Sequence, residues 1–304
     1  MISHRLIYVK SNLPKEVEMK QYKLFMDVSG DVLHEIAGDS VGLVPMEFII
    51  DGKSYIYTDS DEGMNPIEFY QYVKQGIAIK TSQITPAFYE NYFDETLKNG
   101  YSVLYLCLSS KLSSTYMSAC HASETLKEKY PDVDFVPVDS LQATVGMGLL
   151  CEKMIENRNN GLSIEQNKES LLVARSHITT TGVVDDLNAL KRGGRISATV
   201  AVIGGVLNFK PVIAVKEDGS LQMSTTTHGM KKALKYFVDL FTETHDENSK
   251  VVYIMHADEE KNSLALQDML LQAFPDLQIR RRLLSPIIGA HLGKGLVGLA
   301  FYKK

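Results

Sequence analysis

The 304-residue chain carries a formal net charge of -5, and 44% of its residues are hydrophobic. This acidic balance argues against nonspecific nucleic-acid binding, which needs a basic surface. No stretch approaches the roughly 20 apolar residues of a membrane span, so we expect no integral membrane segment and a cytoplasmic location. The three cysteines, Cys107, Cys120 and Cys151, are widely spaced in apolar surroundings, and we expect them to be reduced core residues.

After a polar segment at 1–21, the first half of the chain alternates apolar runs with amphipathic segments. Apolar runs between turn residues predict strands, and helical spacing after a capping residue predicts helices. Pro45 interrupts one run, and Asp51-Gly52 predicts a hairpin turn. Repeated strand, turn and helix imply a parallel sheet with helices on its faces. The predicted strands are 22–26, 41–50, 53–57, 103–108 and 134–139, and the predicted helices are 65–73, 85–100, the segment that ends at 130, and 144–157.

Hydroxyl side chains gather between the strand 103–108 and the helix after it. They are Ser109, Ser110, Ser113, Ser114 and Thr115. Backbone N–H groups and the helix dipole favour an anion at such a turn, although these residues also serve as helix caps, for which one hydroxyl suffices. A second cluster, Thr81-Ser82-Gln83, precedes the helix 85–100. We expect both clusters at the carboxyl ends of strands, where parallel sheets bind ligands.

The segment 157–161 is the best candidate for a domain boundary, because it is polar, rich in turn residues and followed by a helix-starting serine. We therefore expect a parallel-sheet α/β domain at 1–160 and an α+β domain at 161–304. In the second domain a basic glycine turn at 191–195 precedes an apolar helix at 198–207. The other predicted elements are a β-branched segment at 176–184, a helix at 185–191, a hairpin of 210–216 and 221–227, strands at 250–256 and 278–284, and a helix at 259–273.

Several short motifs occur together in this chain, and their order and spacing resemble those of the DegV family. They are Thr81-Ser82-Gln83, LSSKLSSTY at 108–116, VVDDL at 183–187 with GGRIS at 193–197, NFKP at 208–211, and IGAHLG at 288–293 with GLAFY at 298–302. Each motif alone is weak, but jointly they cover about residues 22–302. The chain is therefore identified as similar to members of this family over nearly its whole length.

The resemblance implies a two-domain α/β protein that binds a long-chain fatty acid, with its carboxylate at the domain interface and its acyl chain in an apolar tunnel. Family members present the bound acid to a fatty-acid kinase in bacteria that have one, and the carrier itself is not the catalyst. The resemblance thus implies a long-chain fatty acid, such as C14 to C18, as ligand, a fatty-acid kinase as partner, and no catalytic residue. The sequence has no Walker loop, Cys-x-x-Cys pair or His-Glu-x-x-His motif, so we infer no cofactor and no metal.

Carried over by position, the head-group contacts fall on polar residues from both ends of the chain: Thr81, Ser82, Ser113, Ser114 and His291. Hydroxyls and an imidazole donate hydrogen bonds to a carboxylate without a buried permanent countercharge. Arg192 and Arg195 can approach the carboxylate or a partner's phosphate, although cations beside a Gly-Gly turn more often lie on a solvated surface.

The sequence departs from the family pattern in two places. Ser114 stands where glycine is common, and the segment 225–230 lacks the arginine that many members carry before Lys231-Lys232. The resemblance links that segment to kinase docking, so the identity of the partner stays open. Two other functions also stay open: an acyl ester or thioester hydrolase using Ser113, and a regulatory module in which lipid only stabilises the fold.

Two further polar groups have simple structural interpretations. The residues Asp27, Ser29 and Asp31 match a family turn but need only cap a helix. The run 280–282, three arginines, is interpreted as an exposed strand face.

Overall fold

The computed structural model describes residues 21–58, 64–185, 187–197 and 208–304. Its N-terminal sheet has the strand order β2-β1-β6-β7, and all neighbouring strands are parallel. The strands are β1 Tyr22–Asp27, β2 Val41–Val44, β6 Ser102–Cys107 and β7 Phe135–Asp139. Every residue of β6 is buried, because helices cover both faces of the sheet, and this explains its continuous apolar run. The predicted parallel sheet is confirmed.

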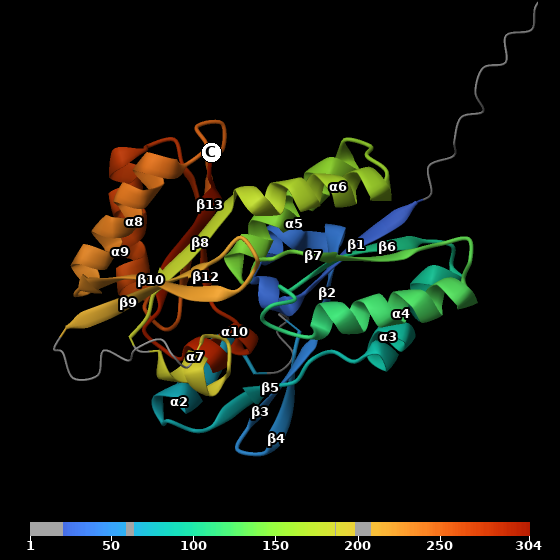
Figure 1. Cartoon of the computed structure of the whole chain (residues 1–304), viewed down its shortest axis with the longest axis horizontal. Helices are drawn as coiled ribbons and strands as arrows, with labels where there is room; N and C mark the ends of the chain where they lie inside the picture. The colour runs from blue at the N-terminus through green and yellow to red at the C-terminus, as the bar shows by residue number, and fades with distance from the viewer. Residues whose placement is uncertain (1–20, 59–63, 186, 198–207) are drawn as a thin grey trace, which may run out of the picture.

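Two pairs of helices cover this sheet (Figure 1). The pair α3 Pro86–Lys98 and α4 Thr115–Lys129 lies on one face, and α5 Val145–Asn159 and α6 Ile164–Ala174 lie on the other. Thr85 caps α3 by accepting a hydrogen bond from the Phe88 N–H, with Pro86 in the first turn. Helix α6 follows the expected boundary at 160 and packs beside β7. The division of the chain at that residue stays a prediction.

At Pro45 the chain leaves the N-terminal sheet and enters a small antiparallel sheet. Its strands are β3 Met46–Ile50, β4 Lys53–Tyr57 and β5 Ile79–Thr81, in the order β4-β3-β5. Asp51 and Gly52 have φ of 48° and 79°, as the predicted hairpin turn requires. Our placement of Thr81-Ser82-Gln83 at the end of a parallel strand was wrong, because β5 pairs antiparallel with β3. A strand of three residues is too short for sequence pattern to assign its neighbour.

The C-terminal sheet has the order β10-β9-β8-β13-β11-β12 and is mixed. In β11, Val252 and Ile254 face a core under α8 and α9, whereas Tyr253 and Met255 face the core that continues into the N-terminal half. The two sheets therefore share one hydrophobic core, with α5 between them (Figure 1). The elements are β8 Ile178–Val183, β9 Phe209–Val215, β10 Leu221–His228, α8 Met230–Thr244, β11 Val251–His256, α9 Glu260–Ala273, β12 Gln278–Leu283 and β13 Val297–Tyr302.

Three short helices lie between the sheets, near the small antiparallel sheet (Figure 1). They are α2 Pro66–Lys74, α7 Asn188–Arg192 and α10 Pro286–Leu292. Helix α7 begins later than the predicted helix 185–191, and α10 and β13 were not predicted as elements. The expected helix at 198–207 and the polar segment at 1–20 lie outside the described residues.

The interpretation of 280–282 as an exposed face was wrong. Strand β12 lies between α5 and α9, which carry acidic side chains toward it. Arg280 lies 3.6 Å from Glu152, and its side chain is 26% exposed. Arg281 lies 3.7 Å from Glu260 and is 28% exposed. The arginines face carboxylates on opposite faces of the sheet, a pairing between distant segments that a local charge pattern does not reveal. Within the described ranges, we find no helix both long and apolar enough to cross a bilayer.

Candidate functional site

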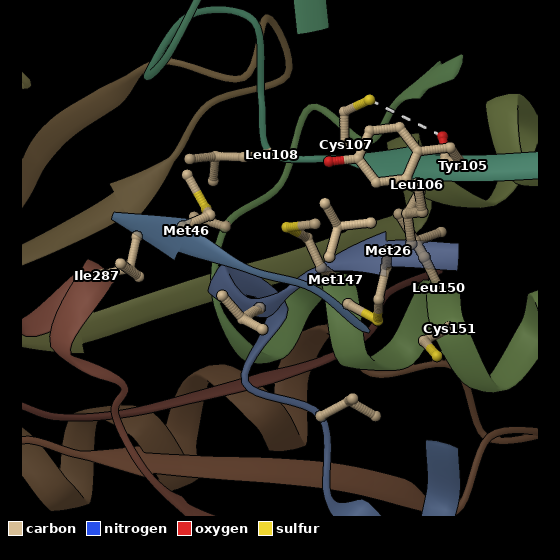
Figure 2. Packing of buried hydrophobic residues seen from close by; sticks show 14 of the residues in the cluster. Met26, Met46, Tyr105, Leu106, Cys107, Leu108, Met147, Leu150, Cys151 and Ile287 are labelled. Atoms are coloured by element: carbon tan, nitrogen blue, oxygen red, sulfur yellow. Dashed lines mark hydrogen bonds between the residues drawn. The ribbon is translucent and has the colours of Figure 1, made fainter. Parts of the chain in front are cut away.

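A cavity of about 260 Å³ lies where the three sheets and α10 meet. Most of its wall is apolar. Figure 2 shows three of these side chains, Met46 from β3, Leu108 after β6 and Ile287 from α10, gathered in one region. Because these residues come from all parts of the chain, the cavity exists only in the assembled fold. Other apolar lining residues are Leu112, Ile213, Val215, Leu221, Met255 and Leu296.

Thr81 and His291 form a polar pair in the cavity wall. The Thr81 Oγ1 and His291 Nε2 atoms lie 2.8 Å apart, although the residues are 210 positions apart in the chain. Thr81 ends β5, and His291 lies in the last turn of α10. Burial, and secondarily the positive charge of Arg195, lower the pKa of His291 to about 4. At neutral pH the imidazole is therefore uncharged, with one N–H to donate.

The backbone packs closely against His291. A Cβ atom on Gly193 would lie 2.7 Å from the His291 Nδ1 atom, so this position accepts no larger side chain without moving the imidazole. The glycine turn that the sequence showed beside two cations thus fits against the ring.

The serine turn, residues 108–114, forms another part of the wall. The buried Asp27 carboxylate accepts a hydrogen bond from the Leu108 N–H at 2.8 Å, which fixes the start of the turn. The Ser113 Oγ atom lies 2.8 Å from Thr115 Oγ1 and accepts from the Thr115 N–H at 3.2 Å. Ser114 is the N-cap residue of α4 but makes no side-chain capping bond. Ser113 and Ser114 both line the cavity.

The predicted site residues separate into two groups. Thr81, Ser82, Ser113, Ser114, Arg195 and His291 all line the cavity. Arg192 does not; it lines a second hollow of about 710 Å³, here called the outer pocket. The outer pocket also contains Thr81, Arg195 and His291, so these three residues border both hollows.

Arg195 links the two halves of the wall. Its Nε atom donates to the Leu112 carbonyl at 3.1 Å, and its guanidinium also donates to the Gly193 carbonyl. Burial lowers the pKa of Arg195 from its ordinary value. Arg195 thus uses part of its N–H donors on backbone carbonyls beside the site. The Ser82 backbone N–H donates to the Glu47 carbonyl at 3.2 Å, which ties this residue to β3.

Sequence reasoning missed three threonines in the wall: Thr144, Thr180 and Thr181. The Thr180 and Thr181 hydroxyls donate to the Gln142 side chain and the Ile213 carbonyl, both at 2.8 Å. Their β-branched shape suits a strand, and nothing in the local sequence distinguishes them from ordinary strand threonines. In the ranges that the structure covers, we find no group of three or more His, Cys, Asp or Glu side chains arranged for a metal.

Fold and site together define an α/β protein with a mostly apolar cavity, whose wall also carries hydroxyls, a neutral imidazole and Arg195. A family model described as "Uncharacterised protein, DegV family" matches residues 22–304. A DegV domain-containing protein of Clostridium perfringens is 33% identical over 285 residues, covering 93% of this chain and 98% of the relative. The chain belongs to the DegV family.

Solved structures agree with this assignment. A DegV family protein from Thermus thermophilus, described as fatty-acid-binding, matches with a TM-score of 0.81 and 29% identity over 93% of this chain and 100% of that one. A Thermotoga maritima protein described as revealing a fatty acid binding function matches with a TM-score of 0.81 and 25% identity, over 94% and 100%. The expected fold class and family are confirmed.

Proposed function

We propose that this protein binds a long-chain fatty acid of C14 to C18, with the acyl chain in the cavity and the carboxylate at the polar residues of its wall. The observation that carries this proposal is the Thr81–His291 pair, which lines a mostly apolar cavity together with Ser113 and Ser114. The two fatty-acid-binding relatives support the same ligand class.

The residue types suit a carboxylate. Hydroxyls and a neutral imidazole donate hydrogen bonds worth about 1.5–3 kcal/mol each when the acceptor is charged. Each buried methylene contributes about 0.8 kcal/mol, so a tail of about fourteen contributes up to roughly 11 kcal/mol before ordering costs. We therefore expect the tail to dominate the affinity and Thr81, Ser113, Ser114 and His291 to determine the orientation of the ligand.

Mass spectrometry of the organic extract from purified, denatured protein tests this proposal. We expect about one C14 to C18 acid per chain in the wild type and less in Ser113→Ala and His291→Ala. A Tyr22→Phe variant, altered at a hydroxyl that binds the Leu162 carbonyl away from the cavity, should retain the wild-type content. Absence of lipid, together with failure to bind added fatty acid, would contradict the proposal.

We further propose that the protein is not a catalyst. The hydrogen bonds described for Ser113 are with Thr115, and that of His291 is with Thr81, so the two side chains are not joined as a nucleophile and its base would be. A fluorophosphonate probe should leave Ser113 unlabelled, and acyl esters and thioesters should show no turnover. Covalent labelling at Ser113 would favour the hydrolase.

As a carrier, the protein would present the carboxylate to a fatty-acid kinase in the cytoplasm. The outer pocket supports this role, because it reaches Thr81 and His291 from the surface and contains the cation Arg192. We also propose the division into domains at 1–160 and 161–304, with the ligand between them. Incubation with a fatty-acid kinase and ATP should yield acyl phosphate; bound lipid without such transfer would favour a regulatory module.

A further inference from the structure

A buried carboxylate outside the proposed head-group contacts joins three segments that surround the cavity. Asp31 follows β1 and the short 3-10 helix η1 Val28–Gly30. The residue is only 3% exposed. Its Oδ2 atom accepts a hydrogen bond from the Thr144 hydroxyl at 2.7 Å. Its Oδ1 atom accepts from the Ser285 N–H at 2.9 Å. These partners lie 113 and 254 positions away in the chain.

Each partner begins an element of the cavity wall. Thr144 is the N-cap residue of α5 and itself lines the cavity. Ser285 is the N-cap residue of α10, the helix that carries Ile287 and His291. Because α10 has only seven residues, fixing the N–H of its N-cap residue Ser285 constrains the direction in which His291 leaves its last turn. Helix η1 packs against both α5 and α10, so Asp31 lies at their junction.

The backbone at two of these residues is strained. Asp31 has φ 44° and ψ 37°, a left-handed conformation that aspartate tolerates better than most residues. Thr144 has φ 48° and ψ -135°, which is far less favourable for a β-branched residue. Such conformations persist where surrounding contacts hold them, and they concentrate at functional sites. The Asp31–Thr144 hydrogen bond joins the two strained residues directly.

We propose that Asp31 is a positioning residue that holds Thr144 and the first turn of α10 in place, and thereby sets the position of His291 in the cavity wall. A merely local helix cap would need neither distant partner. The positive charge of Arg282 on β12 acts on the same carboxylate. Burial, and secondarily the charge of Asp31, raises the pKa of the Tyr70 hydroxyl on α2. The carboxylate thus connects the N-terminal half of the chain to α10 at one buried point.

The first experiment measures the pKa of His291 by NMR in the full-length protein, with His291→Gln identifying its signal among the eight histidines. We expect Asp31→Ala to raise this pKa by at least one unit toward its ordinary value, because α10 loosens and the imidazole gains water. Asp31→Asn should keep the His291 pKa at about 4, since the amide oxygen of asparagine accepts from the Ser285 N–H and its NH2 group donates to Thr144.

Asn167→Ala is the matched control for loss of a buried polar contact. Asn167 is fully buried and donates to the Met154 carbonyl at 2.9 Å, away from the cavity. The Asn167→Ala variant should lower thermal stability as Asp31→Ala does, but it should leave the pKa of His291 unchanged. If Asp31→Ala does not fold, Thr144→Val and Thr144→Ser replace it: valine removes the hydroxyl and should raise the His291 pKa, whereas serine keeps it and should not.

The second readout is the affinity for cis-parinaric acid, a fluorescent fatty acid. This affinity measurement rests on the proposed function, whereas the measurement of the His291 pKa does not. The proposed function and the positioning role of Asp31 can therefore fail separately. We expect Asp31→Ala to weaken binding at least tenfold and Asp31→Asn less than threefold. A folded Asp31→Ala protein with the His291 pKa still near 4 and unchanged affinity would overturn the positioning role. Failure of the wild type to bind the probe would contradict the proposed function and leave the pKa comparison to decide on Asp31.

Discussion

The buried Asp31 and the partly buried His291 have pKa values shifted in opposite senses from their ordinary ranges. Burial raises the pKa of Asp31 to about 6, against the opposing hydrogen bond from Thr144 and the charge of Arg282. Burial lowers the pKa of His291 to about 4, and the charge of Arg195 adds to this effect. Both residues are therefore held in environments that disfavour their charged forms.

These shifts predict two pH-dependent contributions to the free energy of unfolding, and the two contributions have opposite signs. Folded Asp31 takes up its proton near pH 6, before the unfolded chain does, so it adds stability as the pH falls from about 6 toward 4. Unfolded His291 is protonated near pH 6.5, before the folded protein, so it removes stability over nearly the same interval. Each contribution amounts to about 3 kcal/mol, and in the wild type they largely cancel.

Single variants should reveal each contribution. Relative to the wild type, His291→Gln should gain stability as the pH falls from 7 to 4, and Asp31→Asn should lose it. Urea unfolding at several pH values measures both slopes, and the double variant serves as the control because it should restore a profile close to that of the wild type. Identical slopes for the two single variants would contradict this prediction.

Gly193 gives a prediction about the site itself. With φ of -73°, its backbone suits alanine, but the added Cβ would lie 2.7 Å from His291 Nδ1. We expect Gly193→Ala to displace the imidazole and weaken fatty-acid binding about tenfold while costing under about 1 kcal/mol of stability. Gly194→Ala is the neighbouring control for binding, because its Cβ would meet nothing within 4 Å, although its φ of 70° means that alanine there costs stability through backbone strain. Equal affinities for the two variants would show that the position of His291 does not depend on Gly193.

Among the elements, the β9–β10 hairpin and the serine turn form one closure of the cavity. The Ser109 hydroxyl donates to the Gly219 carbonyl at 2.8 Å, and a Cβ on Gly219 would clash with that hydroxyl oxygen. Leu112 of the serine turn and Leu221 of β10 both line the cavity. The hairpin tip therefore has to approach the turn closely for the wall to be complete.

The Gly219→Ala variant should move the tip of the β9–β10 hairpin away from the serine turn. Gly219 has φ of 84° and Gly161 has φ of 78°, but only Gly219 has neighbours within 4 Å of an added Cβ. Gly161→Ala thus reports backbone strain, about 1 kcal/mol, and any further loss in Gly219→Ala reports the contact. We expect a further loss of about 1–3 kcal/mol by urea unfolding and faster release of fatty acid by stopped-flow fluorescence. Release rates alike in the two variants would argue against a closing role for this contact.

For the whole molecule, the cavity lies within a core that both large sheets share, so a ligand there stabilises residues from both halves of the chain. Removing the lipid should therefore lower the melting temperature cooperatively. At a free fatty-acid concentration one hundred times the Kd, the stabilisation should be about 2.7 kcal/mol. Calorimetry of the delipidated protein with added palmitate measures this stabilisation. Methyl palmitate, which lacks the carboxylate, is the control for the head group. A melting temperature that does not respond to palmitate would contradict it.

The amino-acid sequence by itself determined most strands and helices, since their periodicity and caps are local: the buried run of β6, the Asp51-Gly52 hairpin and the Thr85-Pro86 helix start were all predicted. Its motifs also identified the family. Tertiary structure alone decided that β5 belongs to an antiparallel sheet, that the arginines of β12 face carboxylates, and that Asp31 binds Thr144 and Ser285. The meeting of Thr81 with His291 likewise depends on packing across 210 positions, because burial and hydrogen-bond partners arise from contacts between segments that no local pattern records.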